Sequence, residues 1–116
     1  MAAPALHIQL LHTDSCAPGS AEAARAAAEA ALAQLGLEIE IEDVTVTTEK
    51  ESLHYGMVGG PAIMVNGVDV DPAVRAMTAG GLGCRAYITA EGFSSAPPVS
   101  MIVAALEEAL KPSTSP

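Results

Sequence analysis

Hydrophobic positions occur in short runs along the first half of the chain, and these runs predict strands. Residues 7–12 are mostly apolar and are followed by polar residues 13–15, which is typical of a buried strand that leads into a loop. Residues 37–47 alternate apolar and mostly acidic positions, which predicts a strand with one buried face. Residues 62–65 form a third apolar run. Asn66-Gly67 after it predicts a tight hairpin to a fourth strand at residues 68–70.

Three segments carry helix signals. Residues 20–35 are rich in alanine and end at Gly36, a residue type that favours a left-handed C-terminal cap. Thr48 and Glu51 have the spacing of a capping box, which predicts a short helix that ends near Gly56. After two prolines, apolar residues recur at helical spacing, so a last helix is expected over residues 97–111.

The order of these elements predicts one α/β domain over residues 1–116. A strand, a helix and a second strand require a right-handed crossover between parallel strands, and the hairpin adds an antiparallel strand. We therefore expect a mixed four-stranded sheet with helices on both faces.

The chain leaves the expected sheet before its last helix. Asp71-Pro72 has the form of a helix cap with proline at the first helical position. The glycine-rich stretch that follows shows no clear period, so residues 71–96 are interpreted as an insertion. Residues 112–116 are expected to be a disordered polar tail.

Composition and charge exclude several kinds of partner. With 116 residues, 50% of them hydrophobic, the chain can bury one modest core. A net charge of -9 with five Lys and Arg argues against nucleic acid and against an anionic membrane surface. The start lacks the basic residues of a targeting peptide, and no apolar run approaches the roughly 18 residues of a spanning helix. We therefore expect a soluble cytoplasmic protein.

The chain has two cysteines, Cys16 and Cys84. Two are too few for a disulfide framework, and a reducing compartment would leave both as thiols at rest. Each is therefore a candidate for chemistry.

Two segments resemble one family. Residues 16–19 read Cys-Ala-Pro-Gly between the first strand and helix, and residues 59–63 read Gly-Gly-Pro-Ala-Ile before the third strand. They resemble the Cys-Gly-Pro-Cys site and the cis-proline strand of the thioredoxin-like superfamily, with glycine in place of the second cysteine. The resemblance covers about residues 7–70 and the last helix, and implies a thioredoxin-like fold with a cis bond before Pro61. The later Cys-Arg-x-Tyr resembles small bacterial thioredoxin-like proteins, some of which carry an alkylmercury-lyase label.

The resemblance implies roles for the residues around Cys16. The N–H groups at the start of the first helix would favour its thiolate and lower its pKa, while Asp14 would oppose this effect. Gly60, held by the cis bond before Pro61, would pair with an extended thiol substrate. Position 19 lacks a thiol, so a mixed disulfide must be resolved by a thiol from elsewhere.

The expected topology offers that second thiol. The third strand runs away from the Cys16 end of the sheet and the fourth returns to it, so the insertion starts there and could carry Cys84 back. Arg85 could hold the carboxylate of glutathione, as this region does in related glutaredoxins. No resident cofactor is expected, although glutathione could take part.

Three functional hypotheses follow. The leading one is a thiol-dependent redox protein that acts on disulfides or thiol adducts, protein substrates included, through Cys16, with Cys84 or glutathione as the resolving thiol. The second is a protein that binds mercury, copper or zinc, or handles organomercurials, through Cys16 and Cys84 with His12 as a third ligand. The third is a redox-inactive binding module whose edge strand serves a partner or a homodimer.

A simpler structural interpretation stands beside each candidate residue. Cys16 could be an ordinary loop residue outside a helix capped by Ser20. Cys84 could be a small buried hydrophobic residue, and His12 could simply end its strand.

Overall fold

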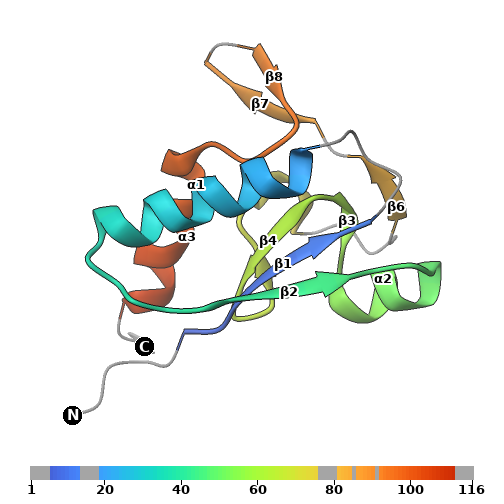
Figure 1. The fold of residues 1–116 in the computed structure, drawn as a ribbon, viewed down its shortest axis with the longest axis horizontal. Coiled ribbons are helices and arrows are strands. Elements are labelled where there is room, and N and C mark those ends of the chain that lie inside the picture. The colour runs from blue at the N-terminus through green and yellow to red at the C-terminus, as the bar shows by residue number, and fades with distance from the viewer. Residues whose placement is uncertain (1–5, 14–18, 76–80, 85, 91, 112–116) are drawn as a thin grey trace.

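The central sheet is mixed and has four strands. The computed structural model describes residues 6–13, 19–75, 81–84, 86–90 and 92–111. Strand β1 (Ile8–His12) pairs in parallel with β2 (Ile41–Thr45) and antiparallel with β4 (Ala62–Val65), which pairs antiparallel with β5 (Val68–Asp69). The order is β2-β1-β4-β5 (Figure 1). The prediction of a mixed four-stranded sheet is confirmed.

Three α-helices accompany the sheet in the described residues. They are α1 (Ser20–Gln34), α2 (Glu49–Tyr55) and α3 (Val99–Leu110), and Pro72–Val74 adds a single 3-10 turn. The capping box is present, because the Glu51 N–H donates to the Thr48 hydroxyl at 3.1 Å. Asp71 likewise accepts from the Ala73 N–H at 3.0 Å. Both predicted caps are therefore present, and each depends only on residues two or three positions apart in the sequence.

The sheet buries apolar side chains on both faces. On β1, Ile8 and Leu10 point into a cluster with α1 and α3, whereas Leu11 points into a second cluster on the side of α2. On β4 the same alternation separates Ile63 from Met64. Helices thus lie on both sides of the sheet, as expected, with α1 beside α3 (Figure 1).

The second strand is shorter than its alternating pattern predicts. The pattern begins at residue 37, but β2 begins at Ile41, whose Cα partner is Ile8 at the start of β1. Residues 37–40 precede that partner and pair with no strand among the described residues. Leu37 and Ile39 still pack against the main cluster, which explains their apolar character.

The hairpin after β4 has the expected geometry. Asn66 and Gly67 both have positive φ, 52° and 78°, as a two-residue hairpin loop with the right-handed strand twist requires. The chain then returns along β4, and the Val70 N–H donates to the Ile63 carbonyl oxygen at 3.1 Å.

The insertion contains more regular structure than its sequence predicts. Strand β3 (Val58–Gly60), just before β4, pairs in parallel with β6 (Gly81–Cys84). Strands β7 (Tyr87–Thr89) and β8 (Gly92–Ser94) form a separate antiparallel hairpin. Figure 1 shows this hairpin projecting beyond α1. No helix in the described residues is long and apolar enough to cross a membrane.

Candidate functional site

The peptide bond between Gly60 and Pro61 is cis, as expected from the sequence. Pro61 is buried, and it separates β3 from β4. Because Ala62 is the Cα partner of Leu11, the cis bond lies beside the end of β1.

The backbone of Gly60 lies close against the end of β1. A Cβ atom at this glycine would be 3.6 Å from the His12 Cα and 3.5 Å from the Thr13 Cγ2. It would also be 2.6 Å from the Met57 Cε, which is too close without movement of that buried side chain. A side chain at position 60 would therefore displace the end of the flexible Met57 side chain, whereas its contacts with His12 and Thr13 would be ordinary ones. The chain leaves β1 toward Cys16 at this point.

Strand β6 brings Cys84 to the same place. Cys84 is the Cα partner of Gly60 in the parallel pair of β3 and β6. It is exposed and disulfide-bonded, so the expectation of a free thiol at rest is not met at this residue. It is also not the buried hydrophobic residue of the simpler interpretation. The pairing with β3, and not the local sequence, determines its position.

Several predicted site residues lie outside the described part of the chain. They are Cys16, Asp14 and Arg85. Cys16 is the other cysteine of the chain. The roles expected for these residues, and for Gly60 as a substrate-binding residue, stay predictions.

Tyr87 is a site residue that the sequence analysis did not single out as functional. Its hydroxyl donates a hydrogen bond of 2.7 Å to the carbonyl oxygen of Pro61, and its side chain is fully buried. This bond attaches the start of the β7–β8 hairpin to the cis-proline. The available signal was a large aromatic residue in a glycine-rich stretch of a chain with 3% aromatic residues.

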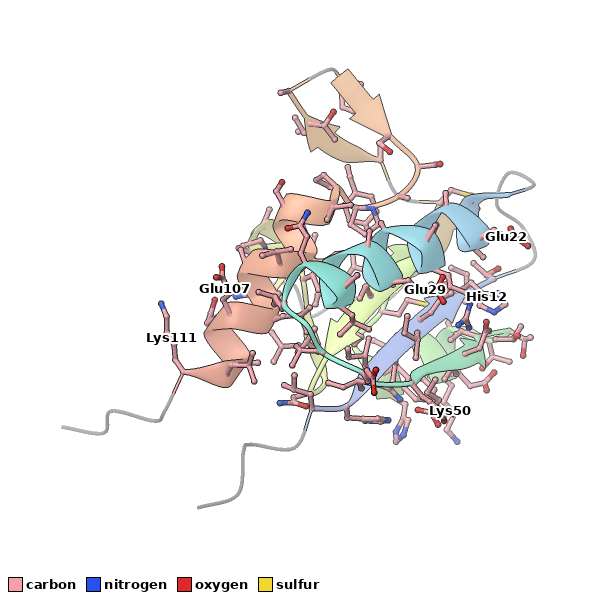
Figure 2. The ribbon with its side chains drawn as sticks, turned by 60° about the vertical axis from the view of Figure 1, so that its left-hand side comes forward. His12, Glu22, Glu29, Lys50, Glu107 and Lys111 are labelled. Atoms are coloured by element: carbon pink, nitrogen blue, oxygen red, sulfur yellow. The ribbon has the colours of Figure 1, made fainter. Side chains whose placement is uncertain are left out.

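His12 belongs to a charged group at the end of β1. Its Nε2 atom contacts the Oδ1 atom of Asp43, and the Arg25 Nη2 atom of α1 donates to Asp43 Oδ2 at 2.7 Å. Hydrogen bonding to Arg25, and secondarily to His12, holds the pKa of the Asp43 carboxyl below its ordinary value. Figure 2 shows His12 at the end of β1 that leads toward α1.

Metal ligation by His12 together with Cys16 and Cys84 stays a prediction, because Cys16 lies outside the described residues. Among the described residues, no three His, Cys, Asp or Glu side chains form a group that could hold a metal ion. The contact of its Nε2 atom with Asp43 places His12 beside β2 at the end of its strand.

The N-cap residue of α1 is a glycine. This residue, Gly19, has a positive φ of 86° and makes no side-chain hydrogen bond to the first turn. The alternative in which Ser20 caps the helix is wrong, because Ser20 is already the first helical residue. Glycine adopts this left-handed conformation at low cost, so the N-cap lies at Gly19, one residue before Ser20.

A scan against protein-family models found no match to this chain, and neither did searches of curated proteins and of solved structures. What the protein does must therefore be inferred from its own residues and geometry.

Proposed function

We propose that the protein has a thioredoxin-like fold and exchanges thiols and disulfides at the cis-proline. The sheet order β2-β1-β4-β5, the helices on both faces and the cis bond before Pro61 all fit that fold. A fold alone does not establish an activity, so the functional proposal depends on the cysteines.

The observation that carries the proposal is the position of Cys84. It is disulfide-bonded, exposed, and paired with Gly60 next to the cis bond. The only other cysteine of the sequence, Cys16, follows the strand that ends against Gly60. We therefore assign a Cys16–Cys84 disulfide to the oxidised form of the protein. An exposed disulfide is accessible to an attacking thiolate.

The exchange needs no further reagent beyond a disulfide substrate. In the reduced protein, the Cys16 thiolate attacks one sulfur of the substrate disulfide, forming a mixed disulfide and releasing one substrate thiolate. The Cys84 thiolate then attacks the Cys16 sulfur and releases the second substrate thiolate. The substrate gains two electrons, and two protein thiolates become one disulfide.

The start of α1 supports a nucleophilic role for Cys16. The N-cap residue, Gly19, has no side chain that could accept from the N–H groups of the first turn, and these groups together with the helix dipole favour a nearby anion. Such an environment lowers the pKa of a cysteine thiol and raises its thiolate fraction at neutral pH.

Single cysteine variants test the proposal. We expect Cys16→Ser to abolish reduction of a small aromatic disulfide reagent, because the attacking thiolate is gone. We expect Cys84→Ser to react once and then retain the reagent on Cys16, which mass spectrometry would detect. Thiol titration of the oxidised wild type should give no free thiol before reduction and two after it.

The double variant Cys16→Ser/Cys84→Ser serves as the control for background reaction. Equal rates in the double variant and the wild type would refute the exchange reaction. Turnover by Cys84→Ser that requires added glutathione would instead assign the resolving step to glutathione.

A further inference from the structure

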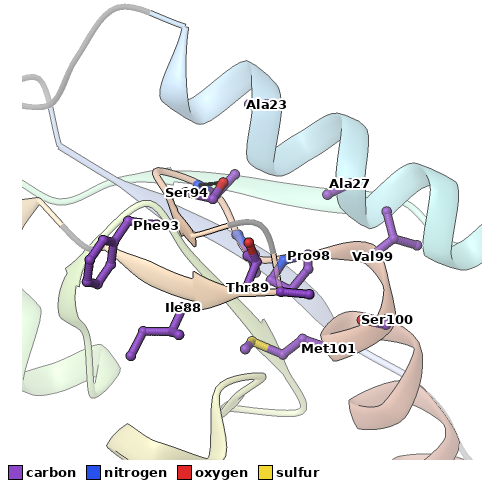
Figure 3. Close-up of a pocket in the computed structure, with 13 residues that line it drawn as sticks. Ala23, Ala27, Ile88, Thr89, Phe93, Ser94, Pro98, Val99, Ser100 and Met101 are labelled. Atoms are coloured by element: carbon purple, nitrogen blue, oxygen red, sulfur yellow. Dashed lines mark hydrogen bonds between the residues drawn. The ribbon is translucent and has the colours of Figure 1, made fainter.

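A groove lies between the β7–β8 hairpin and the starts of two helices. It has a volume of about 950 Å³, and Ala23 and Ala27 of α1, Ile88 and Phe93 of the hairpin, and Val99 and Met101 of α3 lie along it (Figure 3). We propose that this groove binds an extended apolar segment of a protein substrate next to its reactive cysteine. This inference rests on the proposed thiol exchange and names the class of its substrate.

Two large apolar side chains mark the groove as a binding surface. Ile88 and Phe93 are directly opposite each other across the hairpin, and so lie on one face of it. Their exposed fractions are 76% and 79%, the highest among the large hydrophobic residues of the described chain. An exposed apolar pair at the edge of a groove is typical of a recognition site.

The uncharged side chains along the described part of the groove favour an apolar ligand over a charged one. None of the described side chains that line it is charged, although the chain as a whole carries a net charge of -9. Arg25 and Arg75 lie outside it and pair with acidic residues. The described lining therefore complements the apolar side chains of a polypeptide and includes no basic partner for the carboxylates of glutathione.

The backbone arrangement explains why a protein substrate would dock here. The edge of β3 at Gly60, where a thiol substrate was expected to pair, is already paired with β6 of the same chain. In contrast, β7 and β8 pair only with each other in the described residues, which leaves each strand one edge for an added strand.

The groove begins only a few residues along the chain from the cysteine site. Ile88 follows Cys84 by four positions, a span of at most roughly 14 Å in an extended chain. The bond from the Tyr87 hydroxyl to Pro61 fixes the start of the hairpin at the cis bond. A few residues of a substrate can therefore reach from the hairpin to the disulfide.

Binding can be measured separately from redox chemistry with a peptide that cannot react. The probe is a short peptide with leucine, valine and phenylalanine on either side of a central serine, titrated into the oxidised full-length protein by calorimetry. We expect Phe93→Ser and Ile88→Ser to weaken its affinity by about tenfold or more, because each loses an apolar contact area. The matched control is Leu53→Ser, which changes a 57% exposed apolar residue on α2.

Exchange with a small aromatic disulfide reagent provides the second readout. We expect it to be equal in the wild type and in all three variants, since the reagent does not need the groove. If this exchange is absent while the peptide still binds in a Phe93-dependent way, the proposed function fails and the docking site stands.

Two results would overturn the docking site. One is an affinity for the peptide that Phe93→Ser leaves unchanged or that Leu53→Ser weakens equally. The other is a wild type that fails to bind the peptide but forms a dimer by sedimentation, with Phe93→Ser monomeric, because the groove would then be occupied by a second copy.

Discussion

The four-stranded sheet and the segment 81–94 are held in different ways. The sheet is held by burial, because apolar side chains from β1 and β4 fill clusters on both of its faces. The segment 81–94 has one fully buried large side chain, Tyr87, among its described residues. It is held by pairing with Gly60, by the Tyr87 hydrogen bond and by the disulfide of Cys84. The proposed chemistry thus lies in the part that depends on a few specific bonds.

The largest loss of unfolding free energy should come from creating a cavity in the main apolar cluster that packs against the sheet. Leu106 of α3 is fully buried in the main cluster, so Leu106→Ala should lower the free energy of unfolding by about 3–5 kcal/mol. Chemical denaturation measures this. Phe93→Ala, at an exposed site in the segment 81–94, should change it by less than about 0.5 kcal/mol. Similar losses of unfolding free energy in both variants would contradict the conclusion that burial holds the sheet but not the segment 81–94.

A smaller loss of unfolding free energy should follow from removing the hydroxyl group of Tyr87 in the segment 81–94. Tyr87→Phe leaves the buried Pro61 carbonyl without its hydroxyl donor, which should cost about 1–3 kcal/mol. Hydrogen exchange of residues 88–94 should rise in the same variant, because the hairpin loses its attachment. Tyr55→Phe, at a half-buried tyrosine on α2, is the control. Unchanged exchange in Tyr87→Phe would show that the hydrogen bond to Pro61 does not hold the hairpin.

The smallest change in unfolding free energy should follow from removing the charge of Asp43, which contacts His12 at the end of β1. The pKa of Asp43 is lowered by Arg25 and His12, so their interaction stabilises the fold above the ordinary carboxyl pKa of about 3.9. That stabilisation is lost as the pH falls through the lower, folded-state pKa. Asp43→Asn should therefore lower the unfolding free energy near neutral pH by less than about 1 kcal/mol, because the pair is partly exposed to solvent.

Unfolding of Asp43→Asn and the wild type should be compared across this pH range. The difference between them should shrink as the pH falls, and it should also shrink in high salt. A difference that grows on acidification would contradict the ion-pair interpretation.

The sheet region could be predicted because its signals are local. The Asn66-Gly67 turn, the Thr48 cap and the alanine-rich helix α1 each depend on residues close in sequence. Strand order then followed from connection rules, and the cis bond from the resemblance around Pro61.

The segment 81–94 could not be predicted in the same way. Strand β6 reads Gly-Leu-Gly-Cys, which carries no hydrophobic period, and its partner β3 lies more than twenty residues earlier in the chain. The Tyr87 bond to Pro61 is equally remote in sequence. Topology predicted that Cys84 could return to the sheet end, but only the strand pairing specifies Gly60 as its neighbour.

The buried position of Tyr87 has an optical consequence. The chain contains two tyrosines and no tryptophan, so all of its tyrosine emission comes from Tyr55 and Tyr87. In a Tyr55→Phe background, the emission would report on the single phenol bonded to the cis-proline. The protein thus contains its own spectroscopic reporter of whether the hairpin is attached to the sheet.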